Sequence, residues 1–361
     1  MPPSKRQDPR PDESESPNPY PPLSPEQVRA KKRVLKRPVR AADVRSGMAV
    51  ADLVEAMGEM SIQARNLGTC ARVLTAMYED RGRPTVFLGL AGPLIAAGLR
   101  KVIRDLVVGG YVDVLVSTGA ILYQDVYQAR GNRHWRGTPA ADDVALRDLR
   151  IDRIYDTYVD EEAFWRTDQW CGRVADEMEP GTTSSRAYLD FLGSKLDDPD
   201  SIVYQCHRLG VPIFSPALND SSIGIGLTEH YHRCRRDGRP GIAIDSIRDN
   251  YELTQIVVAS RKTAAVYVAG GVPKNYINDS IVSAYIFGEE RGHDYAIQVT
   301  TAVTQDGGLS GSTLGEAQSW GKIDRKARFA MAWVEPSVSL PMLAGYAFDR
   351  HPAPPRPRLH F

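Results

Sequence analysis

The sequence predicts a protein of the α/β class, in which a doubly wound, mostly parallel sheet carries flanking helices. Short apolar runs typical of buried strands recur along the chain, and segments of helical period separate several of them. The first strand, helix and strand follow one another within about 30 residues, and such a βαβ unit requires a parallel sheet. With 361 residues, of which 42% are hydrophobic, the chain can form one large domain and still leave polar tails.

The predicted elements begin after residue 45. Residues 48–75 carry apolar side chains at roughly helical spacing, and residues 85–90 form an apolar run typical of a buried strand. A helix is expected over residues 91–108, because Pro93 is tolerated in a first turn, and a strand over 112–117. Further strands are predicted at 211–214, 241–245, 263–268, 294–299 and 329–333, and helices at 184–195 and 250–260. This order indicates a doubly wound α/β sheet, with a globular pattern that begins at residue 46.

Both ends of the chain differ in composition from this domain. Residues 1–45 are rich in proline and charge and are expected to be a disordered tail, and residues 351–361 a proline-rich tail. The basic stretch 29–40 can be interpreted as a site for an anionic partner, as a targeting patch, or as a linker or helix face at an oligomer surface.

Composition excludes several classes of protein. The 45 basic and 45 acidic side chains give no net charge, which argues against nucleic-acid binding. We expect no membrane span, since no run of about 18 apolar residues occurs, and no secretory signal. The four cysteines lack a CxxC motif, which favours reduced thiols in a cytoplasmic protein. His230, His232 and Cys234 resemble a metal cluster, but no second ligand pair has suitable spacing, so no metal is predicted.

Small residues follow four of the predicted strands. In open α/β sheets, ligands bind at the carboxyl ends of strands, and glycine lets backbone N–H groups approach a phosphate closely. The loops at 117–120, 215–224, 269–275 and 300–311 therefore indicate either a nucleotide or dinucleotide site or ordinary tight turns. No G-x-G-x-x-G motif follows a strand.

The segment 316–323, Glu-Ala-Gln-Ser-Trp-Gly-Lys-Ile, places Lys322 close to Trp320 and Glu316. A partly desolvated lysine can lose its proton and attack a carbonyl or imine carbon. Tryptophan can hold a cationic amine over its ring, and Glu316 can pair with one. The alternative is a surface lysine near a core tryptophan.

Four segments together resemble deoxyhypusine synthase, in consistent order within about residues 46–350. They are the segments 214–220, 270–274, 301–307 and, above all, 316–323. The resemblance implies a Rossmann-like homotetramer with NAD and the active sites at a dimer interface. It also implies that spermidine is oxidised with NAD, that 1,3-diaminopropane leaves, and that the aminobutyl group is held as an imine on a lysine. The acceptor is a lysine of a translation initiation factor in the parent enzymes and putrescine in homospermidine-forming relatives.

The resemblance assigns roles to residues of this chain. It implies that Lys322 forms the imine and that Trp320 and Glu316 belong to the catalytic site. The cofactor-binding residues that it implies are Thr118, Gly119, Asp220, Ser222, Gly270, Gly271, Thr301, Ala302, Asp306, Ser310 and Glu335, the last replacing the usual aspartate. The substrate-binding positions are Asn275, Asp279, Gln298, Ile225 and Leu309.

Several of these positions depart from the family pattern. Ile225 and Leu309 stand where the family has two aspartates that bind ammonium groups, and Asn275 stands where it has a histidine. Gln298 replaces a tyrosine and Gln124 a glutamate. The absence of these carboxylates removes charge-assisted contacts with ammonium groups, which contribute roughly 1.5–3 kcal/mol each. Three hypotheses follow: an aminobutyl transferase with a small polyamine acceptor, a true deoxyhypusine synthase acting on a protein, and a non-catalytic NAD-binding assembly protein.

Overall fold

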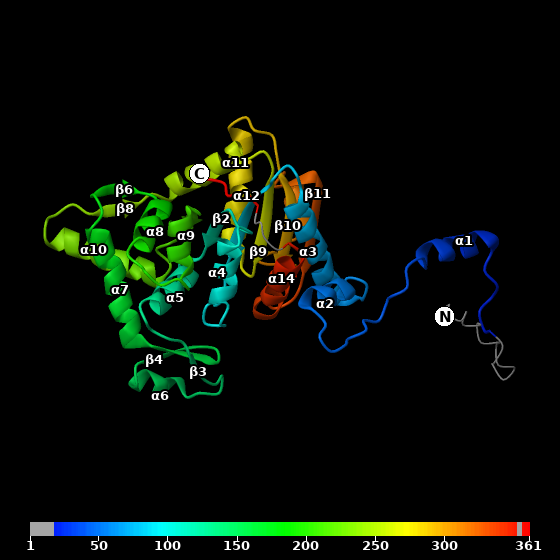
Figure 1. Ribbon diagram of the computed structural model, residues 1–361, viewed down its shortest axis with the longest axis horizontal. Coiled ribbons are helices and arrows are strands. Elements are labelled where there is room, and N and C mark those ends of the chain that lie inside the picture. Colours follow the sequence, from blue (N-terminus) through cyan, green and yellow to red (C-terminus); the bar gives the residue numbers. More distant parts are fainter. Residues whose placement is uncertain (1–17, 352–355) are drawn as a thin grey trace. The chain divides into compact units, whose positions relative to one another are not determined.

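The computed structural model describes residues 18–351 and 356–361 (Figure 1). Its contacts divide the chain into two units, Met1–Arg40 and Ala41–Phe361. Within the described part of the first unit, α1 (Pro25–Val34) begins at Ser24 with a capping box, because Ser24 and Gln27 bond to each other's backbone N–H groups. Part of the basic stretch is therefore helical. The disorder expected for residues 1–17 concerns positions outside the described residues.

A six-stranded parallel sheet forms the centre of the second unit, and this confirms the predicted fold class. Its strands, in spatial order, are β11 (Ile323–Ala332), β10 (His293–Val299), β9 (Thr263–Val268), β1 (Thr85–Leu90), β2 (Val114–Ser117) and β7 (Ile213–Phe214). The chain builds outward from β1 to β7 and then starts again on the other side of β1 with β9. The strand order thus reverses between β1 and β9, which is the point where doubly wound sheets open a crevice.

Helices cover both faces of this sheet. One face packs against α3 (Ile62–Glu79), α4 (Arg100–Val108) and α14 (Pro336–Arg350), with α2 (Val50–Met57) outside them. The other packs against α11 (Ser246–Ala259), α12 (Gly271–Ile286) and α13 (Leu314–Ser319). Beyond β7 lie α5 (Gly119–Ala129), α7 (Glu161–Asp176), α8 (Ser185–Gly193), α9 (Ile202–Leu209) and α10 (Ser222–Arg236).

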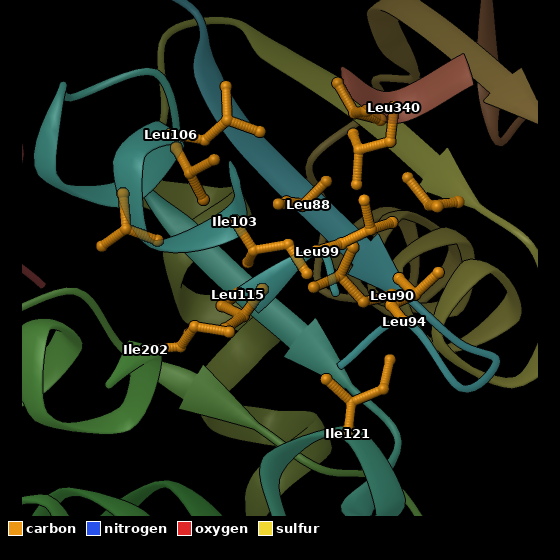
Figure 2. Close-up of a cluster of buried hydrophobic side chains, with 14 of the residues drawn as sticks. Leu88, Leu90, Leu94, Leu99, Ile103, Leu106, Leu115, Ile121, Ile202 and Leu340 are labelled. Carbon is orange, nitrogen blue, oxygen red and sulfur yellow. The ribbon is translucent and has the colours of Figure 1, made fainter. Parts of the chain in front are cut away.

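Alternating side chains of the central strands supply two hydrophobic cores. Leu88 and Leu90 of β1 pack on the α4 and α14 side with Ile103 and Leu340 (Figure 2), whereas Phe87 packs on the α12 side. Every residue of β1 is buried. A strand buried on both faces has a continuous apolar sequence, which is why the sequence predicted β1 and β9 so well.

Two smaller sheets were not predicted. One is antiparallel and consists of β3 (Trp135–Arg136), β5 (Thr157–Asp160) and β4 (Ile151–Ile154), with α6 (Asp143–Asp148) beside it. The other pairs β6 (Gly181–Thr183) with β8 (Ile242–Ile244). The strand predicted at 241–245 therefore exists but lies outside the main sheet.

Two helices are shorter than the sequence predicted. Gly92 and Gly98 have φ of 84° and 87°, and the segment between them is irregular, so α4 begins only at Arg100. The helical pattern predicted over 48–75 is divided between α2 and α3, because Ser61 is extended and Ile62 has φ of 56°. The two helices pack closely. A Cβ on Gly68 of α3 would lie 2.4 Å from the backbone of Gly58, so the close approach requires glycine.

The described end of the chain packs against the domain rather than leaving it. Arg356 donates to Pro84 O and to Asp113 Oδ2, at 2.8 and 3.1 Å. Arg358 donates to Val108 O at 2.6 Å, and Phe361 packs beside the core on the α12 side. Among the helices described, none has the length and apolar composition needed to cross a membrane.

Candidate active site

Lys322 follows a tight turn that ends α13. Gly321 has φ of 71°, a left-handed conformation that favours glycine, and its N–H donates to Gln318 O. The Lys322 N–H donates to Ala317 O at 3.0 Å, which closes the turn. The Ser-Trp-Gly-Lys sequence is therefore a helix ending that fixes the backbone of Lys322 directly before β11.

The side chain of Lys322 reaches towards the middle of α12. Its Nζ lies 3.2 Å from Asn275 Oδ1 and 3.0 Å from Asp279 Oδ1. Asn275 and Asp279 are one helical turn apart, and Asn275 Nδ2 donates to Asp279 Oδ2 at 2.8 Å. Nζ also lies 5.5 Å from the centre of the Trp320 ring, within cation–π range. The lysine side chain is 15% exposed, so it is neither a free surface lysine nor fully desolvated.

These groups line a cavity of about 420 Å³ between α12, α13 and the 307–312 segment. Leu309 and Trp320 lie at its border, and their exposed fractions are 50% and 73%. Trp320 is therefore not the core tryptophan of the alternative interpretation. The lining residues are Lys274, Asn275, Asn278, Asp279, Gly307, Leu309, Ser312, Glu316, Ala317, Trp320 and Lys322.

Glu316 has a structural bond as well as a place in the cavity wall. Its Oε2 accepts from the N–H and the hydroxyl of Thr313, at 2.6 and 2.8 Å, which forms the capping box of α13. The backbone bond from Thr313 is the main cause that holds the pKa of Glu316 below its usual value, so the carboxylate stays ionised. The second oxygen, Oε1, remains available for an ammonium group.

The carboxyl ends of neighbouring strands are in register at one edge of the sheet, and most of the other expected site residues lie at this edge. The paired residues are Leu90 with Ser117, Leu90 with Val268, Val268 with Val299, and Val299 with Ala332. Thr118 and Gly119 follow β2, and a Cβ on Gly119 would lie 2.3 Å from the Ser221 hydroxyl, so this turn touches the loop with Asp220 and Ser222. The loops after β2 and β7 are thus brought together.

The loops at the switch point between β1 and β9 approach each other closely. A Cβ on Gly270 would lie 2.9 Å from the Ala91 side chain, and Ala269 has an unusual φ of 66°. The Gly271 N–H donates to Ser310 Oγ at 2.9 Å, and Gln298 Nε2 donates to Ser310 O at 2.9 Å. Gln298 is fully buried, and its Oε1 has no partner among the described residues.

The remaining edge residues come from the segments after β10 and β11. Thr301 and Asp306 are exposed, and Ala302 donates its N–H to Thr300 Oγ1. Glu335 is the N-cap of α14 and accepts from the Ser337 N–H at 2.8 Å. All of them lie on the same edge as Gly270, because the strands are parallel.

Comparison with known proteins identifies the family. The family model described as deoxyhypusine synthase matches residues 52–347. The chain belongs to the deoxyhypusine synthase family. It is 42% identical to a deoxyhypusine synthase-like protein of Chlorobaculum parvum, over 91% of this chain and 94% of that one. It is 43% identical to a probable deoxyhypusine synthase 2 of Archaeoglobus fulgidus, over 80% and 94%. In fold it is similar to a putative deoxyhypusine synthase of Entamoeba histolytica, with a TM-score of 0.58 and 18% identity over 86% and 97% of the two chains.

The expected substrate positions of this family member do not all meet in the cavity. Asn275, Asp279 and Leu309 line it. Gln298 lies under Ser310 at the sheet edge. Ile225 lies on α10, is 58% exposed and is not among the lining residues of the cavity. Within one chain, therefore, only three of the five positions are adjacent to Lys322.

Sequence reasoning missed Lys274 as a side chain of the site. This residue was noted only as the end of the 270–274 run, yet it is 3% exposed and lines the cavity beside Lys322. Its position directly before Asn275 was the available signal, because neighbouring residues near the start of one helix lie close to the same strand end. A buried lysine cannot be recognised from sequence without the acceptors that surround it.

His230 of the histidine–cysteine cluster belongs to a hydrogen-bonded network. His230 Nδ1 lies 2.7 Å from Asp176 Oδ1, and His230 Nε2 accepts from the Ile242 N–H at 3.2 Å. Asp176 also accepts from Arg233 and Arg239. Asp176, His230 and Cys234 place potential ligand atoms within 4.8 Å of one another, but the His230 nitrogens and both Asp176 oxygens already have bonds. These bonds join α7, α10 and β8.

Proposed function

We propose that this chain is a NAD-dependent transferase in which Lys322 holds a 4-aminobutyl-type group as an imine between a polyamine donor and an amine acceptor. The observation that carries the proposal is the position of Lys322, whose amine lies inside a cavity lined by hydrogen-bonding and ionic side chains. Membership of the deoxyhypusine synthase family supports a transferase.

The sheet edge fits a dinucleotide. Gln298 Oε1, which has no partner among the described residues, lies beneath Ser310. Glycines let the loops approach each other closely at the switch point, and α5 and α12 begin at this edge. Thr118, Gly119, Asp220 and Ser222 would hold NAD from one side. The residues that would hold NAD from the other side are Gly270, Gly271, Thr301, Ala302, Asp306, Ser310 and Glu335. When bound, NAD takes two electrons and a proton from the donor amine and returns them after transfer.

Lys322 exchanges one amine for another. Its neutral Nζ attacks the C=N carbon of the oxidised donor, a new C=N bond forms to Nζ, and the bond to the diaminopropane nitrogen breaks. The protons of Nζ pass to the leaving amine, and Asp279, at 3.0 Å, lies within reach to relay one. The acceptor amine then displaces Lys322 by the reverse exchange.

Trp320 and Glu316 are suited to hold the charged end of an amine. The exposed indole ring can cover an ammonium group, and Oε1 of Glu316 can pair with it. The other carboxylate of the cavity wall, Asp279, is paired with Lys322, and Leu309 offers no charge. The wall therefore fits an acceptor with one ammonium group besides the reacting amine. This favours a short diamine, as in homospermidine formation, over a longer polyamine.

The exposure of Trp320 and Leu309 at the cavity border supports a homotetramer in which a second subunit covers the site. All four cysteines are buried and free, which supports a cytoplasmic enzyme.

Borohydride trapping tests the proposal. The protein is incubated with NAD, spermidine and borohydride, and the adduct is mapped by mass spectrometry. An aminobutyl adduct at Lys322 is expected, and its absence with spermidine and every related polyamine would contradict the proposal. Product analysis then compares putrescine with an initiation-factor protein as the acceptor. Incorporation of the aminobutyl group into the initiation-factor protein alone would favour the deoxyhypusine synthase alternative. NAD binding without any turnover would favour the assembly-protein alternative.

A further inference from the structure

A second lysine, Lys274, lies in the wall of the cavity that holds Lys322. Its Nζ donates to Leu309 O at 3.1 Å, to Ser312 O at 2.5 Å and to Ser312 Oγ at 2.8 Å. An ammonium group has three N–H donors, so three acceptors match its charged form. Lysine is almost never fully buried unless it is paired. Its partners are neutral oxygens of the 309–312 segment, and no carboxylate of the described residues forms a direct ion pair that cancels the positive charge.

The charge of Lys274 interacts with the groups around it. Burial is the main cause that lowers the pKa of Lys274 to about 8; the carboxylate of Glu316 opposes this shift and the charge of Lys322 adds to it. Lys274 is therefore positively charged at neutral pH. The repulsion between two ammonium groups is mutual, so a charge on Lys274 also disfavours a charge on Lys322.

We propose that Lys274 is a positioning residue whose fixed charge promotes the neutral, nucleophilic form of Lys322 while its three bonds hold the 309–312 wall of the cavity. The inference rests on the proposed function of Lys322. A neighbouring cation is a known means of activating a lysine nucleophile in enzymes.

The other charged groups that line the cavity act in the opposite direction. Asp279 of α12 is paired with Lys322, and Glu316 lies on α13. Both carboxylates favour the ammonium form of Lys322. Lys274 is the only other cation among the described lining residues. Removing its charge would therefore leave the two carboxylates unopposed.

The nucleophilicity of Lys322 can be measured without donor or NAD. The protein is treated with butanal and cyanoborohydride between about pH 6 and about pH 10, and alkylation of Lys322 is quantified by mass spectrometry. At pH 7, Lys274→Gln is expected to label Lys322 about tenfold more slowly than the unmodified protein. The two curves should converge above about pH 8, where Lys274 loses its charge. Lys274→Arg keeps the charge and should follow the unmodified protein at pH 7.

The matched control is Lys101→Met, which removes an exposed lysine of α4 paired with Asp200. This variant should label Lys322 at the unmodified rate. Equal labelling in Lys274→Gln and the unmodified protein would overturn the inference. So would an equal loss in Lys274→Gln and Lys274→Arg at every pH, because arginine retains the charge.

If Lys274→Gln does not fold, Lys274→Arg carries the test. Its guanidinium stays charged at about pH 9, so Lys322 should label faster there than in the unmodified protein, and an unchanged curve would overturn the inference. If the proposed function is wrong but the inference about Lys274 is right, the experiments give a different pattern. In that case spermidine and NAD leave no adduct on Lys322, although butanal labels it and Lys274→Gln still slows the labelling.

Discussion

Leu309→Asp is expected to raise the affinity of the cavity for spermidine. Leu309 lines the cavity and is half exposed, and the family resemblance places an aspartate at this position. A hydrogen bond to a charged group contributes about 1.5–3 kcal/mol. Solvent screening at a half-exposed position reduces the expected gain to about 1 kcal/mol. That gain corresponds to about fivefold tighter binding.

Isothermal titration calorimetry of spermidine, with NAD present, measures this gain. Leu309→Asn is the control, because it has the same shape as aspartate without the charge. The advantage of aspartate over asparagine should shrink as salt is raised to about 1 M, where exposed charges are screened within about 3 Å. An unchanged Kd for Leu309→Asp, or an equal gain in both variants, would refute the interpretation that the cavity has lost an ammonium contact.

Three further predictions concern the turn before Lys322 and the stability of the fold. Gly321→Ala should lower the rate of trapping at Lys322 and destabilise the protein by about 1 kcal/mol, because φ at this position is 71°; trapping at the unmodified rate would contradict this. Asp113→Ala should lower the free energy of unfolding by about 3 kcal/mol in chemical denaturation, because it leaves the guanidinium groups of Arg83 and Arg356 without their buried partner. Asp105→Ala removes a half-exposed carboxylate paired with Arg104 and should lower it by about 0.5 kcal/mol. Burial lowers the pKa of His293 to about 3, whereas in the unfolded chain this histidine takes up its proton near pH 6.5. The free energy of unfolding should therefore fall as pH drops from about 6.5 towards 3. His293→Gln should weaken that pH dependence, and an identical pH profile of stability in the variant would contradict this prediction.

The sequence predicted the parts of the fold that depend on local pattern. Residues 263–268 form β9 over the predicted range, because a strand buried on both faces is apolar throughout. The β4–β5 hairpin was missed, since its strands have four residues each and are mostly half-buried or exposed. Short strands with mixed polarity resemble loops in sequence.

The candidate site was predictable as a set of residues but not as a geometry. The segment 316–323 identified Lys322, and strand-end loops identified Gly270 and Ser310. The contacts of Lys322 with Asn275 and Asp279 span 47 and 43 positions of the chain, and they follow from how the β10–β11 crossover packs on α12. Pairings of this kind depend on tertiary structure, which no local pattern encodes.

Under the proposed function, the same crossover explains how a changed amine preference can coexist with a covalent role of Lys322. Between β10 and β11 the chain passes the sheet edge at Ser310, continues through α13 and returns at Lys322. Ser310 bonds to Gly271, Glu316 caps α13, and Gly321 sets the turn, so each of these residues also holds the crossover in place. The side chain of Leu309, by contrast, borders the cavity at a half-exposed position. We therefore expect substitution at such a position to change which amine fits and to leave the framework around Lys322 intact.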